Sequence, residues 1–287
     1  MIRARYRRII LFFARVLFSI VFWDLFLPRV GFSKWSNNTR SERYRTIAAR
    51  YRSLAIQMGG VLIKVGQFLS ARVDVLPEVV TTELAGLQDE VPSENFEDIQ
   101  SVIESEFGMP VVEKYLAFEK MPLAAASLGQ AHLATLVLNH EQAIKLDAGS
   151  TDDDVDQPIE YPVVVKIQRP GIEKIIATDL AAIRTVGGWI KRYPPIKKRV
   201  NIPGLITEFS RTLYEEIDYL AEGRNAETFA LNFSDQPGIL VPKVVWSHTT
   251  KRVLTLQDVR GIKITDYDEI TNVGIEKTEV ASRLLNT

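Results

Sequence analysis

The order of β-rich and helical segments between residues 120 and 262 constrains the fold most. Four short runs in this interval have the alternating or β-branched character of strands: Leu128–Leu138, Val163–Ile167, Leu240–Trp246 and Arg252–Gln257. Helical periodicity occupies about 172–192 and 203–233, between the two pairs of runs. This order is not a βαβ series. It therefore predicts an α+β fold, with a small antiparallel sheet packed against a long helix.

The segment before this interval has a helical texture. Apolar residues at helical spacing predict one helical run from about residue 40 to Leu69, with Pro77 ending it. Further helices are expected at about 78–88 and 94–107. The chain is therefore predicted to have four parts: an arm at 1–35, a helical extension at 36–118, a sheet-containing domain at 119–262 and the start of another helical region at 263–287.

The N-terminal arm is strongly basic. Residues 1–52 hold twelve Arg or Lys and only two acids, although the whole chain has 35 basic and 36 acidic residues. A basic arm on an acidic body predicts a polyanionic partner, either nucleic acid or an anionic membrane surface.

The residues that follow the first arginines favour the membrane. Residues 9–23 are apolar except for Arg15 and Ser19. The run is shorter than the about 20 apolar residues that span a bilayer, and Arg15 near its centre would cost about 2.5–3.5 kcal/mol there. We therefore expect a peripheral helix on anionic lipid at the cytoplasmic face, and no nucleic-acid partner. The alternatives are a helix buried under a domain or oligomer contact and a single N-terminal transmembrane span.

Composition argues against several kinds of site. The chain has no cysteine, which excludes disulfides, thiolate metal sites and a cysteine nucleophile. Its three histidines are widely separated, and the acidic insert at 139–161 has the composition of a loop. No metal site is predicted.

Lys166 is the first candidate for chemistry. A lysine at the end of a β-branched strand is usually a solvated strand end, but with a helix acid as partner it forms a phosphate-binding pair. On a helix over 203–233, Asp218 and Glu222 fall on one side, and Glu216 lies at the border of the apolar stripe. Glu216 is therefore expected to face another packed element, although a solvated acidic face is the plainer interpretation.

Two further stretches are weak signals alone. The small side chains that precede Gln130 suit a loop whose backbone approaches phosphate: Ala124, Ala125, Ala126, Ser127 and Gly129. Lys64 and Gln67 are i, i+3 on one helix face, beside Gly66.

Taken together and in order, six motifs resemble the UbiB/AarF family of atypical kinases, called ADCK in animals. The motifs are Lys64–Gln67 with Ser70–Pro77, Leu84–Asp89, Ala124–Gln130, Val165–Gly171, Glu215–Tyr219 with Glu222 and Asn225, and Val253–Ile262. The resemblance runs from about residue 40 to 270. It implies the N-lobe of a protein-kinase-like fold, with ATP and Mg²⁺ as cofactors.

The resemblance also implies roles for residues. Lys166 would hold the α- and β-phosphates and pair with Glu222, while the segment Ala124–Gly129 covers the nucleotide. The backbone of Gln257 and Val259 would bind adenine as the hinge. Lys64 and Gln67 would lie on a family-specific helix that crosses the active site. The Lys64 side chain would reach two acids, Glu216 and Asp218. Such a helix implies a small-molecule kinase or ATPase that supports isoprenoid-quinone metabolism at membranes.

Two departures limit what the resemblance implies. The family usually has an acid at the position of Gln257, although backbone makes the contact there. No histidine follows His248, so a catalytic His-x-Asp is absent, as are an Asp-Phe-Gly and its metal ligands. We therefore expect a fragment or a truncated gene that needs a missing C-lobe or a partner protein, without ATP turnover of its own. The alternative is a non-catalytic, membrane-associated nucleotide-binding or scaffold protein.

Overall fold

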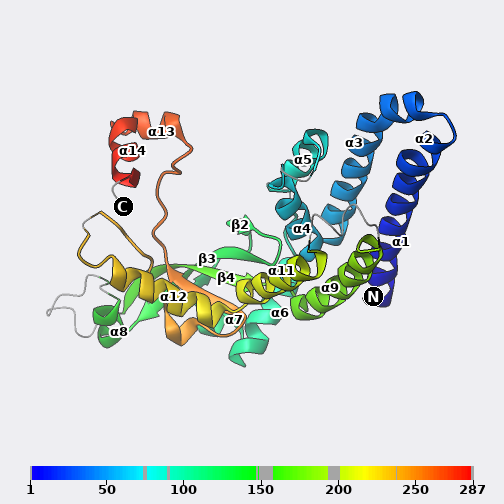
Figure 1. Ribbon diagram of the computed structural model, residues 1–287. Coiled ribbons are helices and arrows are strands. Elements are labelled where there is room, and N and C mark those ends of the chain that lie inside the picture. The colour runs from blue at the N-terminus through cyan, green and yellow to red at the C-terminus, as the bar shows by residue number, and fades with distance from the viewer. Residues whose placement is uncertain are drawn as a thin grey trace.

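The computed structural model describes residues 2–73, 76–88, 91–146, 148, 158–192, 201–236 and 238–285. It has an α+β architecture, in which a bundle of long helices stands beside a small antiparallel sheet (Figure 1). The predicted fold class is therefore confirmed. The acidic run of the insert lies outside the described residues.

The sheet has five strands: β1 (Ala117–Phe118), β2 (Ala124–Ala125), β3 (Gly129–Leu138), β4 (Ile159–Gln168) and β5 (Val253–Gln257). Their order is β1-β3-β4-β5, with β2 also paired to β3, and every pairing is antiparallel. The longest pairing joins β3 and β4 over all ten residues of each strand.

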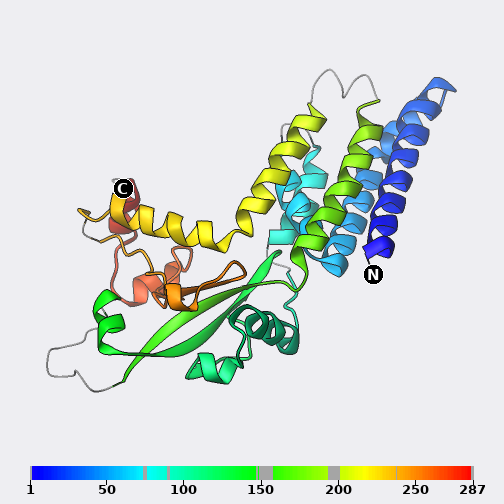
Figure 2. The same ribbon diagram turned by 90° about the horizontal axis from the view of Figure 1, so that it is seen from below.

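The two faces of the sheet have different neighbours. Val163 and Val165 are fully buried in a core shared with α6 (Phe96–Phe107). The alternate residues of β4 point to the opposite face, where Lys166 meets α12 (Tyr219–Asn232). Figure 2 shows the sheet between these two helices. This alternation gives the lysine access to a site, although the three residues before it, Val163–Val165, are all apolar.

The helical bundle contains α1 (Ile2–Ile20), α3 (Ser33–Met58), α4 (Val61–Ser70), α5 (Glu78–Ala85), α9 (Ile172–Ile190) and α11 (Ile202–Glu216). α1 packs along α9, and Ile9 of α1 is fully buried in a core that includes Tyr51 of α3 (Figures 1 and 2). By length and composition, the N-terminal helix Ile2–Arg29 could cross a membrane.

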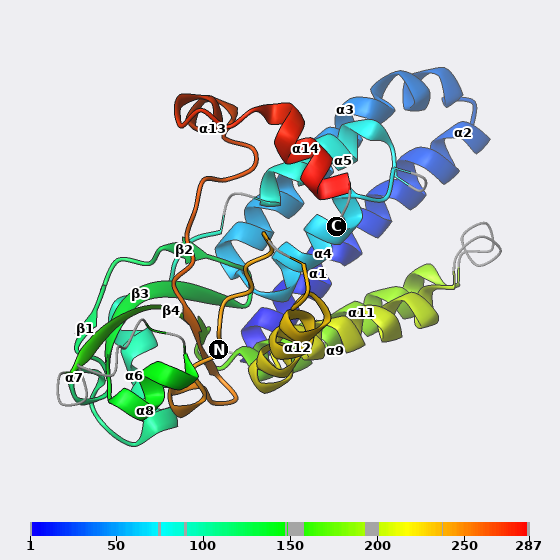
Figure 3. The same cartoon turned by 90° about the vertical axis from the view of Figure 1, so that its left-hand side faces the viewer.

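Shorter elements complete the chain. They are η1 (Val21–Phe26, a π-helical segment), α2 (Leu27–Arg29), η2 (Gly86–Gln88), α7 (Val111–Lys114), α8 (His140–Lys145), η3 (Trp246–His248), α13 (Tyr267–Asn272) and α14 (Lys277–Leu285). Figures 1 and 3 show α13 and α14 set apart from the sheet, on the segment that follows β5.

The prediction of one helix from about residue 40 to Leu69 is wrong. The helix is interrupted at Gly59 and Gly60, whose φ angles of 63° and 67° lie in the left-handed region that glycine adopts without steric cost. α3 also begins at Ser33, so the predicted boundary between residues 35 and 36 falls inside this helix.

The prediction of one helix over 203–233 is also wrong. α11 ends at Glu216 and α12 begins at Tyr219. The Asp218 side chain accepts a hydrogen bond from the Ala221 N–H at 3.0 Å, so Asp218 is the N-cap of α12. The apolar spacing continues across this break, and periodicity therefore did not reveal it.

The predicted strand at 240–246 is wrong as well. Only Val244 forms a bridge, with Leu256 of β5. Pro242 has no N–H to donate to a ladder, which confines the pairing to the residues after it. The insert at 139–161 differs from the expected loop too, because α8 occupies its beginning and β4 starts at Ile159.

Candidate functional site

A pocket of about 480 Å³ lies where the turn between β2 and β3 faces β4, α4, α11 and α12. Its lining consists of Lys64, Ala126, Ser127, Leu128, Gly129, Lys166, Thr212, Glu215, Glu216, Tyr219, Glu222 and Asn225. Small-molecule sites in proteins typically enclose about 300–1,000 Å³. The structure thus gathers seven of the residues selected from the sequence around one ligand-sized space.

The central feature of the pocket is an ion pair between the sheet and α12. The Lys166 Nζ lies 2.7 Å from both carboxylate oxygens of Glu222. The same ammonium lies 4.8 Å from the ring centroid of Tyr219. Both charged side chains stay more than one-third exposed, so the pair is open to the pocket and to solvent.

A second ion pair closes another side of the pocket. The Lys64 Nζ of α4 lies 2.5 Å from the Glu216 Oε1 at the end of α11. Glu216 thus faces a packed element from a distant part of the chain. The side-chain oxygen of Asp218 instead caps α12. Within the described residues, Lys64 therefore contacts one of the two predicted acids.

Gln67 is not part of the pocket lining. Its amide donates to the Leu87 carbonyl oxygen at 2.9 Å. Together with Lys64 it borders a neighbouring groove between α4 and α11. The face of α4 that carries Lys64 and Gln67 therefore packs toward α11. Of these two residues, Lys64 lines the pocket.

The small-residue segment forms a β-hairpin instead of an open loop. Ala124 and Ala125 pair with β3, so only the turn from Ala126 to Gly129 lines the pocket. The Ala126 N–H donates to the Gly129 carbonyl oxygen at 2.8 Å and closes this turn. Ser127, inside the turn, is buried.

Gly129 is required by a close approach of backbone and side chain. A Cβ atom at this position would lie 2.6 Å from both the Ile167 carbonyl oxygen and the Tyr219 hydroxyl. Tyr219 is itself almost completely buried. Its burial, with a smaller contribution from the charges of Glu222 and Glu216, raises the pKa of the phenol far above its usual range. The phenol therefore remains protonated beside the pocket.

Arg169 contacts the backbone of the turn between β2 and β3. It was not predicted as a site residue. Its side chain is buried, donates from Nε to the Ala126 carbonyl oxygen at 3.1 Å and forms an ion pair with Glu94. Another guanidinium nitrogen donates to the Pro92 carbonyl oxygen at 2.5 Å. These contacts join segments far apart in the sequence. The motif Val165–Gly171 contained this arginine, but no local pattern indicated its role.

The predicted hinge residues lie at the end of β5, outside the pocket lining: Gln257 is the last residue of the strand, and Val259 follows it. Gln257 pairs with Val163, three residues along β4 from Lys166, which is about 10 Å at strand spacing. The Gln257 N–H donates to the Lys243 carbonyl oxygen at 2.8 Å. Within the part of the chain that the structure describes, the Val259 N–H has no hydrogen-bond partner.

Four pocket residues had no role assigned from the sequence. Two are the polar side chains of Thr212 and Asn225, which flank the ion pairs from α11 and α12. Tyr219 and Glu215 belonged to a motif, but their position depends on the break between α11 and α12. In the described residues, no group of three or more His, Asp or Glu side chains is arranged to hold a metal ion.

Comparisons with known proteins identify the family of the chain. The sequence matches the ABC1 atypical kinase-like domain over residues 86–161 and 157–287. It is 34% identical over 259 residues to ACTIVITY OF BC1 COMPLEX KINASE 7, a chloroplastic protein of Arabidopsis thaliana, covering 88% of this chain and 34% of that protein. It is 33% identical over 227 residues to a probable protein kinase UbiB of Marinobacter nauticus, covering 79% of this chain and 38% of the relative.

A solved structure is also similar, that of the complex of Rv3197 with erythromycin from Mycobacterium tuberculosis. The TM-score is 0.47 at 24% identity, with 84% of this chain and 55% of the other covered. The chain spans little more than one-third of the length of the two relatives above. The two ranges of the domain match overlap and together cover all residues from 86 to 287. The chain therefore belongs to the ABC1 atypical kinase-like family, which confirms its resemblance to the UbiB-type proteins.

Proposed function

We propose that this chain is the ATP-binding portion of a UbiB-type kinase or ATPase. The observation that carries the proposal is the Lys166–Glu222 ion pair, which joins the sheet to α12 at the edge of the pocket. In protein kinases a strand lysine and a helix glutamate form such a pair, and the lysine holds the nucleotide phosphates.

The shape of the pocket suits the phosphate end of a nucleotide. The turn from Ala126 to Gly129, with three small side chains of four, and Lys166 both line the pocket. Adenine would lie toward the end of β5, where the free N–H of Val259 is a hydrogen-bond donor. The separation of about 10 Å along the sheet leaves room for the ribose between these two ends.

The charge of the pocket indicates that ATP would enter with a cation. The lining contains two ammonium groups, Lys64 and Lys166, against three carboxylates from Glu215, Glu216 and Glu222. A triphosphate adds further negative charge, which a divalent cation such as Mg²⁺ neutralises. The side chains that would bind this ion in a whole enzyme are not predicted from this sequence.

The position of α4 supports a small phosphoryl acceptor. The ion pair between Lys64 and Glu216 fastens this helix across one side of the pocket. An extended protein segment would have to displace α4 to reach the phosphates. The proposal therefore includes a small-molecule substrate, in the metabolism of isoprenoid quinones at a membrane, with the chain peripheral to the cytoplasmic face.

A second candidate is a non-catalytic, membrane-associated nucleotide-binding or scaffold protein. The same pocket and the same Lys166–Glu222 pair would hold a nucleotide in such a protein too. The reading frame beyond Thr287 distinguishes the two. Both motifs downstream would support the enzyme, whereas a stop codon at that point would support the scaffold.

Isothermal titration of the 287-residue chain with ATP and Mg²⁺ tests nucleotide binding. Lys166→Met should weaken binding by about 10- to 100-fold, because a hydrogen bond to a charged group contributes roughly 1.5–3 kcal/mol. Lys145→Met is the matched control, since this exposed lysine pairs with Glu141 on α8, away from the pocket lining. Equal affinities of the wild type and Lys166→Met would contradict the proposal.

A further inference from the structure

A groove of about 440 Å³ runs between α1 and α3 on the outside of the bundle. Six polar side chains form its rim: Arg8, Arg15 and Ser19 from α1, and Arg50, Ser53 and Gln57 from α3. Phe12, Val16 and Leu54 contribute to an apolar floor. The groove thus combines a positively charged rim with a surface on which hydrocarbon could lie.

The charge of this rim is entirely of one sign. Three guanidinium groups line the groove, and none of the described residues in its lining is an Asp or a Glu. Arg8 donates to Gln57. Within the described residues, Arg15 and Arg50 have neither a hydrogen-bond partner nor an ion-pair partner for their side chains. Guanidinium groups in this state match the planar, bidentate geometry of phosphate oxygens.

The surface beside the groove is apolar and open to solvent. Leu11 lines the groove and is half exposed, and Phe18, about two turns further along α1, is 71% exposed. Exposed aromatic side chains continue to the tip of the α1–α3 hairpin, at Phe26 and Trp35. A soluble phosphate would use only the arginines. A membrane lipid would use both the arginines and this apolar surface.

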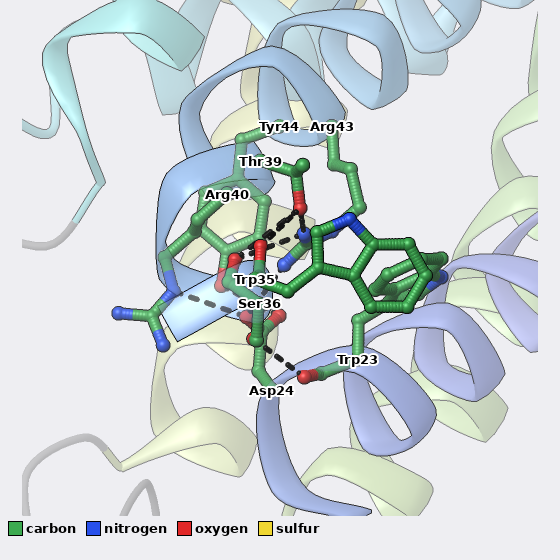
Figure 4. Close-up of polar contacts among 8 residues, drawn as sticks. All are labelled: Trp23, Asp24, Trp35, Ser36, Thr39, Arg40, Arg43 and Tyr44. Atoms are coloured by element: carbon green, nitrogen blue, oxygen red, sulfur yellow. Dashed lines mark hydrogen bonds and ion pairs between the residues drawn. The ribbon is translucent and has the colours of Figure 1, made fainter. Parts of the chain in front are cut away.

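The relative position of α1 and α3 is fixed by polar contacts at both ends of the N-terminal helix. Figure 4 shows the fastening at the tip, where Asp24 accepts hydrogen bonds from the Arg40 Nε at 3.0 Å and from Arg43 at 2.9 Å. Ser36, fully buried, donates to the Trp23 carbonyl oxygen at 2.7 Å. At the base, Arg5 forms a bidentate ion pair with Asp179 of α9.

The contacts of Asp24 also distinguish between a transmembrane and an interfacial position of α1. Arg40 and Arg43 lie on α3 alongside the apolar helix, held there by Asp24. A transmembrane position of α1 would either break these contacts or draw the charged groups into hydrocarbon. A position in the interface leaves the contacts intact, because the exposed aromatic side chains reach the boundary of the acyl region while the charged groups stay at the depth of the phosphates.

We infer that the groove between α1 and α3 binds the phosphate headgroup of an anionic phospholipid, with Arg15 and Arg50 as its principal ligands. This site gives the membrane association proposed above a specific location. It does not depend on nucleotide binding. Phosphatidylcholine carries a phosphate too, but its quaternary ammonium group leaves no net negative charge to balance the three guanidinium groups.

Vesicle co-sedimentation of the full chain tests the inference. We compare phosphatidylcholine vesicles with vesicles that also contain phosphatidylglycerol. The variant R15Q/R50Q should lower the partition coefficient on the anionic vesicles about 30-fold, from roughly 1 kcal/mol for each basic residue at the surface. Both side chains are exposed, and an unchanged thermal midpoint verifies folding.

A matched control separates the site from general electrostatics. R45Q/K145Q removes the same charge from two exposed residues that pair with acids elsewhere, Arg45 with Glu42 and Lys145 with Glu141. This variant should bind anionic vesicles within about threefold of wild type. Equal losses for both double variants would overturn the inference, because they would show that only net charge matters.

A second arm distinguishes lipid from a soluble phosphate. Glycerol 1-phosphate carries the headgroup chemistry without acyl chains. Weak or undetectable binding of this compound, alongside Arg50-dependent binding of anionic vesicles, supports the lipid site. The inference would be overturned if glycerol 1-phosphate bound tightly, if this binding depended on Arg50, and if anionic vesicles did not compete with it. No nucleotide is present in either assay, so failure here and failure of ATP binding are separate outcomes.

Discussion

Replacing Arg5 by Met should destabilise the chain strongly, because it leaves a buried carboxylate without its partner. Asp179 is completely buried, and Arg5 contacts both of its oxygens at 2.6 Å. The same guanidinium donates to the Met58 carbonyl oxygen at 2.5 Å and to that of Gly59 at 3.0 Å. One side chain therefore joins α1, α9 and the break between α3 and α4.

The magnitude follows from the burial of this pair. Removing one partner of a buried ion pair typically costs about 3–5 kcal/mol, whereas replacing both with apolar residues costs far less. We therefore expect Arg5→Met to lower the free energy of unfolding by about 3–5 kcal/mol at pH 7. The double variant R5M/D179L should lose much less than the sum of the two single variants.

The loss of stability in Arg5→Met should also depend on pH. Burial already raises the pKa of Asp179 above its usual range, although Arg5 opposes the effect. Without Arg5 the folded state binds a proton more readily than the unfolded state, whose Asp pKa is about 3.9. Acidification from pH 7 toward pH 5 should therefore reduce the loss in Arg5→Met.

Urea unfolding followed by circular dichroism at the two pH values measures both effects. Surface variants elsewhere usually change stability by less than about 0.5 kcal/mol, so Arg45→Met is a suitable control. A loss below about 1 kcal/mol at pH 7, or an equal loss at both pH values, would refute the role given to this pair.

Three further substitutions test other parts of the structure by unfolding measurements. Gly129→Ala should cost about 1–3 kcal/mol, because its Cβ would meet the Ile167 carbonyl oxygen at 2.6 Å; an unchanged midpoint would contradict this. Burial lowers the pKa of His248 to about 4, so between pH 6.5 and 4 the unfolded state binds the proton first and stability falls on acidification. His248→Gln should lose up to about 2 kcal/mol less over that range, and parallel pH profiles would argue against it. Arg169→Gln should cost about 2 kcal/mol, since Glu94 loses its partner but keeps access to water, and a loss near zero would exclude the anchoring role.

The sequence predicted which segments form helices and strands better than it predicted where these helices and strands end. Periodicity located the helices of the bundle and the strands β3, β4 and β5. It missed the breaks at Gly59–Gly60 and at Asp218, since the apolar spacing continues on both sides of each break. The left-handed φ angles and the side-chain cap that make these breaks are single-residue features, which a periodic pattern averages out.

The arrangement of the pocket was only partly accessible from the sequence. The resemblance to the UbiB-type proteins implied that Lys166 and Glu222 form a pair, and the structure brings the two side chains together. The contacts of Arg169 could not be predicted, because they depend on the path of residues 92–94 under the hairpin. The arm differed in another way. Its apolar pattern has two faces, and the fully buried Ile9 shows that one of them belongs to the bundle.

Hydrogen–deuterium exchange with and without MgATP tests the central claim most directly, because it locates the nucleotide as well as detecting it. The account predicts slower exchange in two places that are distant in sequence, the turn at 126–129 and the segment at 257–259. The helix at 96–107, on the other face of the sheet, is the internal reference and should not change. Protection at both sites, lost in Lys166→Met, is the expected result. Protection at neither site, or at residues 96–107 instead, would contradict the assignment of this pocket to ATP.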